Sequence, residues 1–291
     1  MKTTCYALLA LLAIPAFAQQ SVNPPAGEPS NAQEAAAKKA ASDQRLEERY
    51  QAVVAKLSAA EQAWEKVLQE NLGSFYLPLH KSDKASGKSN AWDFVEDVPG
   101  LPRVLLIGDS VSRGYTQAVR RELKGKANVH RAPENCGPVA NGLRKVDVWL
   151  AHQKWDVIHF NFGIHDRATT VADYSKRLEE FLERIEKTGA KIVWASTTPI
   201  PDDPAKKQSA ASIVERNAAA EVLIKKRGHA VNDLFSKVTP KLDTLQNPKD
   251  VHFTAAGYDF LGAQVAEALR GALAVQSPSP SATGSEGAPQ N

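Results

Sequence analysis

The sequence is short of cysteine, and this scarcity excludes several ways of stabilising a fold. Only Cys5 and Cys136 occur in 291 residues, and Cys5 lies in a segment that we expect to be removed. Cys136 alone cannot form an internal disulfide, so the stability of the mature monomer must come from a packed core. The sequence also has no Cys-x-x-Cys or His-x-x-x-His spacing. We therefore expect no metal site and no cofactor.

Long hydrophobic runs are also lacking. The apolar run at residues 6–14 is shorter than the roughly 20 residues that a membrane-spanning helix needs, so we expect no membrane span. This run follows Lys2 and precedes Ala16-Phe17-Ala18, which is the order of a secretory signal peptide. We interpret residues 1–18 as a signal peptide cleaved after Ala18, and we predict a secreted or periplasmic protein.

No strong excess of one charge sign is present. The chain has 36 basic and 33 acidic residues, and the basic ones are interspersed with acids rather than gathered with aromatic residues. This pattern argues against a nucleic-acid partner. The content of 43% hydrophobic and 24% charged residues is ordinary for a soluble globular protein. The length allows one full-sized domain with appendages.

Residues 31–100 form the first of these appendages, a predicted helical extension. It follows a leader at residues 19–30, which is rich in Pro, Asn, Ser and Gly and which we expect to be flexible. Apolar residues recur at intervals of three and four between Leu46 and Val67, as on one face of a helix. The capping-box pattern from Ser58 to Glu61 predicts a break near Ser58, with a second helix ending at Gly73.

The rest of the extension is predicted to attach these helices to the following domain. Residues 72–79 and 91–95 are too apolar or aromatic to lie free in solvent, whereas residues 81–90 resemble an exposed loop. We expect the two apolar stretches to pack on the core. The helices themselves are either an accessory element of that domain or an arm that contacts a partner. At the other end, residues 275–291 form a Ser/Pro/Gly/Ala tail that we expect to be disordered.

Residues 101–274 alternate strand and helix patterns. Apolar runs at 104–107, 128–131, 155–162, 191–196 and 229–232 have strand length, and amphipathic segments of ten or more residues separate most of them. Such alternation predicts βαβ crossovers and an α/β fold, with a parallel sheet of about five strands and helices on both faces. Sites in such sheets lie beyond the carboxyl ends of the strands.

Polar clusters occur at several of these strand ends. Ser110 stands where the first strand passes into a helix, residues 161–166 follow the third strand, and Asp250-Val251-His252 precedes the last helix. The loop at residues 135–142 supplies a further wall. Ester cleavage requires a serine oxygen, an imidazole base, an acid that orients the imidazole, and N–H donors for the oxyanion. The clusters contain a residue for each role.

The order and spacing of these clusters resemble a known family. Gly108-Asp109-Ser110, the glycine-bearing loop after the second strand, Gly163-Ile164-His165-Asp166 and Asp250-Val251-His252 are similar to the four blocks of the SGNH (GDSL-type) hydrolases. The resemblance implies a flavodoxin-like three-layer α/β/α fold, no metal, and hydrolysis of esters. Acetyl or other acyl groups on carbohydrates or lipids are frequent substrates in this family.

Carried onto this sequence, the resemblance assigns Ser110 as nucleophile, His252 as general base and Asp250 as the acid. It places the backbone N–H groups of Ser110 and Gly137 in the oxyanion hole, with Gly142 as an alternative to Gly137. His165 stands where the family usually has asparagine, so either its imidazole or the amide of Asn161 would supply the third donor. The family's acid usually lies three residues before the histidine, where this chain has Lys249.

We therefore predict a secreted serine esterase that hydrolyses acyl esters, with O-acetyl groups on a small-molecule or polysaccharide substrate favoured. Two alternatives stay open. The substituted asparagine and the shifted acid are compatible with a catalytically impaired glycan-binding or envelope-binding protein of the same fold. A lipid acyl esterase is the other alternative, and it would cleave long acyl chains faster than short ones.

Overall fold

The computed structural model describes residues 31–151, 153–206 and 208–274. The signal peptide and leader predicted before residue 31, and the tail predicted after residue 274, lie outside the described residues. The chain divides into two compact units between Arg45 and Leu46. Residues 31–45 of the first unit form the N-terminal part of helix α1 (Asn31–Val54). The other helices and all of the strands that the structure describes belong to the second unit.

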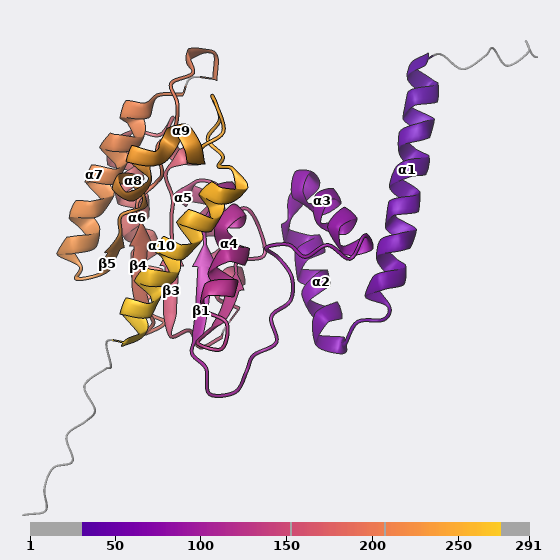
Figure 1. The fold of residues 1–291 in the computed structure, drawn as a ribbon, viewed down its shortest axis with the longest axis horizontal. Coiled ribbons are helices and arrows are strands. Elements are labelled where there is room, and N and C mark those ends of the chain that lie inside the picture. The colour runs from indigo at the N-terminus through magenta and orange to yellow at the C-terminus, as the bar shows by residue number, and fades with distance from the viewer. Residues whose placement is uncertain (1–30, 152, 207, 275–291) are drawn as a thin grey trace, which may run out of the picture. The chain divides into compact units, whose positions relative to one another are not determined.

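A five-stranded sheet forms the centre of this unit (Figure 1). Its strands are β1 (Arg103–Ile107), β2 (Asn128–Arg131), β3 (Val157–Phe160), β4 (Lys191–Ala195) and β5 (Ala230–Asn232). They lie in the order β2-β1-β3-β4-β5, and every neighbouring pair is parallel. The predicted α/β fold and its flavodoxin-like strand order are confirmed.

Helices cover both faces of the sheet because successive strand residues point to opposite sides. Val104 and Leu106 pack into one core with helices α4 (Ser110–Glu122) and α10 (Ala255–Ala274). Leu105 and Ile107 pack into a second core with α5 (Val139–Leu150), α6 (Val171–Glu186) and part of α7 (Ala210–Lys226). Since both faces are covered, β1 reads as a continuous apolar run rather than an alternating one.

Short helical turns complete the connections after β3, β4 and β5. They are η1 (Ile164–Asp166), η2 (Pro204–Lys206), α8 (Leu234–Val238), η3 (Thr239–Lys241) and α9 (Leu242–Leu245).

Helix α10 approaches α4 closely because glycines stand at the contact. A Cβ atom on Gly262 would lie 2.3 Å from the Cβ of Ala118, and one on Gly114 would lie 2.0 Å from the ring of Tyr258. Larger residues at these positions would force the helices apart. This close packing fixes the start of α10, and therefore the loop that precedes it, against the start of α4.

The N-terminal helices of the second unit agree with the sequence in one respect and differ in another. Helix α2 (Ala59–Asn71) begins with the capping box of Ser58 and Glu61 and ends just before Gly73, so the predicted break and end are confirmed. The prediction of an apolar anchor followed by a loop from residue 81 is wrong, because α3 (Gly73–Ala85) runs through both. Pro78 lies inside this helix, and proline in a helix interior normally counts against one.

Candidate active site

Ser110 is the first residue of α4, directly after β1. Asp109 caps the helix, since its side-chain oxygen accepts a hydrogen bond of 2.9 Å from the backbone N–H of Val111. The cap leaves the backbone N–H of Ser110 at the helix N-terminus, where no intrahelical acceptor is available to it. Ser110 is 8% exposed. The strand-to-helix turn that the sequence indicated is therefore present.

Arg131, the last residue of β2, lies beneath this turn. Its guanidinium donates to the carbonyl oxygens of Gly108 and Asp109, both at 3.0 Å, and to the hydroxyl of Ser112 at 2.6 Å. The side chain is buried, and burial lowers its pKa. Arg131 thus holds the backbone of the turn before Ser110 from inside. It was not among the residues predicted from the sequence, although a charged residue ending a strand next to β1 was a usable signal.

His252 and Asp250 lie in a tight loop between α9 and α10. The backbone N–H of Asn247 donates to the carbonyl of His252 at 3.0 Å, which closes the loop. Within it, Lys249 takes a left-handed conformation with φ of 56°. This turn of the chain lets a carboxylate two residues before the histidine reach the imidazole, although Lys249 occupies the position of the family's usual acid.

The three side chains form a continuous hydrogen-bonded relay. The Nε2 atom of His252 lies 2.9 Å from the Oγ of Ser110, and its Nδ1 atom lies 2.9 Å from the Oδ1 of Asp250. Burial raises the pKa of Asp250, but the hydrogen bonds and charge of His252 outweigh it and leave the pKa below its usual value. Asp250 is therefore ionised at neutral pH and can hold a proton on Nδ1, which leaves Nε2 free to accept one from Ser110.

The candidate oxyanion donors differ in how the structure places them. Gly137 lies in the loop after β2 with φ of 63°, a left-handed conformation that favours glycine. Gly142 is inside α5, where a Cβ atom would lie 2.8 Å from the ring of Phe162. Gly142 is therefore a packing glycine and does not belong to the loop. His165 lies in η1 and its side chain is exposed.

Asn161 is engaged elsewhere. Its side-chain nitrogen donates to the carbonyl of Ala195 at 2.8 Å and to the hydroxyl of Thr197 at 3.0 Å. These bonds use both amide hydrogens, so the side chain has none left for an oxyanion. The alternate role that the sequence allowed for Asn161 is therefore wrong for this arrangement. His165 stays the predicted side-chain donor.

Asp166 caps a helix instead of acting at the relay. Its two carboxylate oxygens each lie 3.2 Å from the backbone nitrogen of Val139, the first residue of α5. The side chain is fully buried. Burial outweighs the hydrogen bond and the nearby arginines, and it raises the pKa of Asp166 from 3.8 to about 6.

Cys136 is a buried wall residue beside the turn that leads to Ser110. Its backbone N–H donates to the carbonyl of Gly108 at 3.2 Å, and burial raises the pKa of its thiol to about 12. Such a thiol carries almost no thiolate at neutral pH. Among the residues described, no group of three or more His, Cys, Asp or Glu side chains is placed to hold a metal ion. No helix in the same part of the chain has both the length and the apolar character needed to cross a membrane.

Comparison with known proteins agrees with this geometry. The model of the GDSL-like lipase/acylhydrolase family matches residues 106–260, which is more than half of the chain. The chain therefore belongs to this family of SGNH hydrolases, and its class is carboxylic ester hydrolase. No protein with curated annotation matches it.

Solved structures share the fold at low sequence identity. A lipase/acylhydrolase from Enterococcus faecalis is 23% identical, with a TM-score of 0.52 over 59% of this chain and 96% of that one. A GDSL-like lipase from Bacteroides thetaiotaomicron is 18% identical, with a TM-score of 0.51 over 62% and 93%. An acetyl xylan esterase is 14% identical, with a TM-score of 0.51 over 57% and 99%. The family match begins at residue 106, after the N-terminal helices.

Proposed function

We propose that this chain is an exported serine esterase that removes acyl groups, acetyl groups above all, from carbohydrate through an acyl-enzyme on Ser110. The observation that carries the proposal is the relay from Asp250 through His252 to Ser110, with both hydrogen bonds at 2.9 Å. A serine oxygen becomes nucleophilic when an adjacent imidazole can take its proton. Here that imidazole is in position, and its other nitrogen is held by a carboxylate.

The reaction would proceed in two halves. In the first, the Oγ of Ser110 attacks the ester carbonyl carbon while Nε2 of His252 takes the hydroxyl proton. The tetrahedral oxyanion collapses, the alcohol leaves with the proton from Nε2, and an acyl group stays on Ser110. In the second, water attacks this acyl group, with His252 again taking and returning the proton. The product is a carboxylic acid, and Ser110 is regenerated.

The oxyanion would be bound by backbone donors at the start of α4 and in the loop after β2. The N–H of Ser110 lies at a helix N-terminus, where partial positive charge gathers. Gly137 brings a second N–H through its left-handed conformation. The imidazole of His165 is the third proposed donor. Each such donor contributes on the order of 10²-fold or more to the rate of an acyl transfer.

The carbohydrate substrate and the export are proposed on separate grounds. The N-terminal sequence has the order of a signal peptide, and an exported hydrolase meets extracellular or envelope polysaccharides. One of the structures that share the fold is an acetyl xylan esterase. Together these observations favour an acetylated carbohydrate over a lipid ester.

The test compares the wild type with Ser110→Ala on acetylated sugars and on 4-nitrophenyl acetate. We expect the variant to lose at least about 10³-fold in kcat/KM, as removal of a triad nucleophile does. Ser236→Ala is the matched control, because Ser236 is an exposed serine on α8. A fluorophosphonate probe should label the wild type at Ser110. Unchanged hydrolysis in Ser110→Ala, or a wild type that is neither active nor labelled, would contradict the proposal and favour a binding protein.

A further inference from the structure

Arg113 stands one helical turn after the proposed nucleophile. Residues three apart on a helix lie on the same face, with Cβ atoms about 5–6 Å apart, so the side chains of Ser110 and Arg113 leave α4 on one side. The chain places no other basic residue between positions 103 and 120. Arg113 is half-buried rather than free in solvent.

The guanidinium of Arg113 is held by aromatic rings and not by an acid. Its carbon lies 5.5 Å from the ring centre of Tyr76 and 5.9 Å from that of Trp92. Within the described part of the chain, no carboxylate pairs with it and no acceptor receives its N–H groups. The Nε atom is buried and has no hydrogen-bond partner there. Arginine has five N–H donors in a planar guanidinium. Here the two rings orient that group, but it makes no hydrogen bond within the described residues.

Two neighbouring arginines, the half-buried Arg120 and the buried Arg131, are hydrogen-bonded in a different way. Arg120, two turns further along α4, donates to the carbonyls of Val129, Asn90 and Asp93. Arg131 donates to two carbonyls and a hydroxyl beneath the nucleophile turn. Both are structural arginines whose guanidinium groups are bonded within the protein. Arg113 differs from them because its guanidinium makes no hydrogen bond within the described part of the chain.

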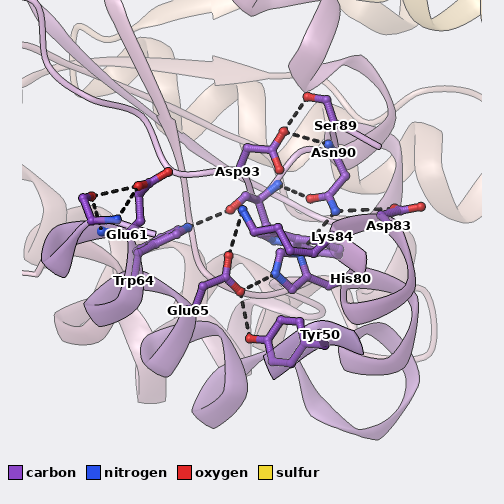
Figure 2. A network of polar contacts seen from close by, with 12 residues as sticks. Tyr50, Glu61, Trp64, Glu65, His80, Asp83, Lys84, Ser89, Asn90 and Asp93 are labelled. Carbon is purple, nitrogen blue, oxygen red and sulfur yellow. Dashed lines mark hydrogen bonds and ion pairs between the residues drawn. The ribbon is translucent and has the colours of Figure 1, made fainter. Parts of the chain in front are cut away.

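Trp92, one of the two rings beside Arg113, is held by a network of polar contacts (Figure 2). The backbone of Trp92 is fastened at both ends: its N–H donates to the side chain of Asn90 at 2.9 Å, and its carbonyl accepts from the indole of Trp64 at 2.7 Å. Asn90 in turn contacts His80 at 3.2 Å. Trp92 is 2% exposed. A ring held in this way can position a charged side chain beside it.

Glu65 is the centre of that network. Its carboxylate accepts from the hydroxyl of Tyr50 at 2.9 Å, lies 2.7 Å from Nε2 of His80 and pairs with Lys84 at 3.0 Å. Burial raises the pKa of Glu65, but the bonds and charges of His80 and Lys84 outweigh it and leave the pKa below its usual value. The network ties the end of α1 to α2, α3 and the segment before Trp92. Hydrogen bonds therefore connect the helices that carry Tyr50, Glu65 and His80 to the segment that carries Trp92.

Tyr258 connects Arg113 to the relay. Its ring packs against Gly114, the residue after Arg113. Burial raises the pKa of its hydroxyl, which also feels the charges of Arg113, Asp109 and Asp250. Arg113 thus lies three residues after Ser110 on α4, on the same helix face.

We propose that Arg113 binds an acidic group, a carboxylate or a phosphate, on the alcohol part of the ester, and that Tyr76 and Trp92 are its positioning residues. The inference rests on the proposed esterase function. An acetyl group carries no charge, so the acidic group that Arg113 binds must be on the alcohol part of the ester. Acidic sugars, such as uronic acids or sugar phosphates, are the substrate class that this chemistry would select. The bidentate fit of guanidinium to either oxyanion supplies the recognition.

The test uses matched acetate esters that differ only in charge. One pair is an O-acetylated methyl glucuronoside and its methyl ester, and the other is an O-acetylated methyl glucoside with and without a 6-phosphate. Acetate release gives kcat/KM for each. We expect the wild type to prefer the charged member of at least one pair, and Arg113→Met to lower that preference about 10- to 100-fold, as loss of a charged hydrogen bond does. The two pairs separate carboxylate from phosphate recognition.

Two further variants distinguish recognition from a structural role. Tyr76→Leu removes the ring under Arg113 and should lower the preference through KM, whereas Tyr76→Phe keeps the ring and should restore it. Arg121→Met is the matched control, because Arg121 is exposed on the same helix and pairs with Asp259. Its preference should equal that of the wild type.

The results of these experiments distinguish a failure of this inference from a failure of the proposed esterase function. If Ser110-dependent hydrolysis is present but the preference is the same in the wild type and Arg113→Met, the inference is overturned while the esterase stands. A lower melting temperature without a changed preference also overturns it, since Arg113 then only joins α4 to α3. If the wild type hydrolyses no ester and takes up no fluorophosphonate, both fail together.

Discussion

Replacing Asp166 with asparagine should change how the stability of the protein depends on pH. The carboxyl of Asp166 is fully buried and its pKa is raised from 3.8 to about 6. In the unfolded chain the same carboxyl would lose its proton near its ordinary value. Between these two pH values the native state therefore binds more protons than the unfolded state, and stability must fall as the pH rises.

The size of the effect follows from the two pKa values. A difference between 3.8 and about 6, at about 1.4 kcal/mol per pH unit, corresponds to about 3 kcal/mol of unfolding free energy. That stability is fully present below pH 4 and lost above pH 6. Asparagine keeps an oxygen that can accept from the N–H of Val139 but carries no charge. Asp166→Asn should therefore gain about 3 kcal/mol relative to the wild type between pH 4 and pH 7.

Urea unfolding at pH values from 4 to 8 measures this directly, with the wild type and Asp166→Asn followed under identical buffers. The quantity of interest is the difference between the two free energies at each pH, so that other titrating groups cancel. Asp243→Asn is a suitable control, because Asp243 is an exposed aspartate in α9. A difference for Asp166→Asn that stays constant over this range would refute the reasoning. It would mean that Asp166 titrates alike in both states.

Other substitutions test the relay, the helix contact and the buried network. Asp250→Asn should lower kcat of ester hydrolysis by about 10⁴-fold, as in other triads that lose their acid, and a value near that of the wild type would assign the orienting role to another group. Gly262→Val places side-chain atoms where a Cβ would already lie 2.3 Å from Ala118, so both the melting temperature and kcat/KM should fall together; an unchanged melting temperature would show that α10 adjusts freely. Glu65→Leu leaves two buried donors, on Tyr50 and His80, and the partly buried Lys84 without their acceptor. It should reduce stability by about 3–5 kcal/mol in thermal or urea unfolding, and a loss under about 1 kcal/mol would contradict the central role of Glu65.

The sequence predicted those features that depend on neighbours close along the chain. The strands showed as apolar runs because both faces of the sheet are covered, and the capping box marked the start of α2 because its two side chains are three residues apart. The acid of the relay was found for the same reason, since Asp250 and His252 are separated by one residue. The left-handed Lys249 that makes the short spacing work could not be read from the sequence, because lysine rarely takes that conformation.

Features that depend on distant residues were missed. Helix α3 was obscured by Pro78 and by the apolar run around it, and tertiary contacts overrode both signals. His80 had no visible partner because Glu65 lies 15 residues away on another helix. Asn161 was a reasonable oxyanion donor until its amide was found bonded to Ala195 and Thr197, more than 30 residues further along. In each case the deciding contact joins elements that only the fold brings together.

The buried charge of Arg131 affects the electrostatic potential inside the molecule. An arginine side chain keeps its proton throughout the pH range in which proteins are folded. The positive charge beside the carbonyls of Gly108 and Asp109 therefore persists over that range. Its hydrogen bonds to their carbonyls polarise two peptide groups, whose N–H ends belong to Asp109 and Ser110. Negative charge that develops at Ser110 thus meets a permanent positive potential from the interior. In the proposed reaction, this buried side chain would stabilise the developing charge without touching the substrate.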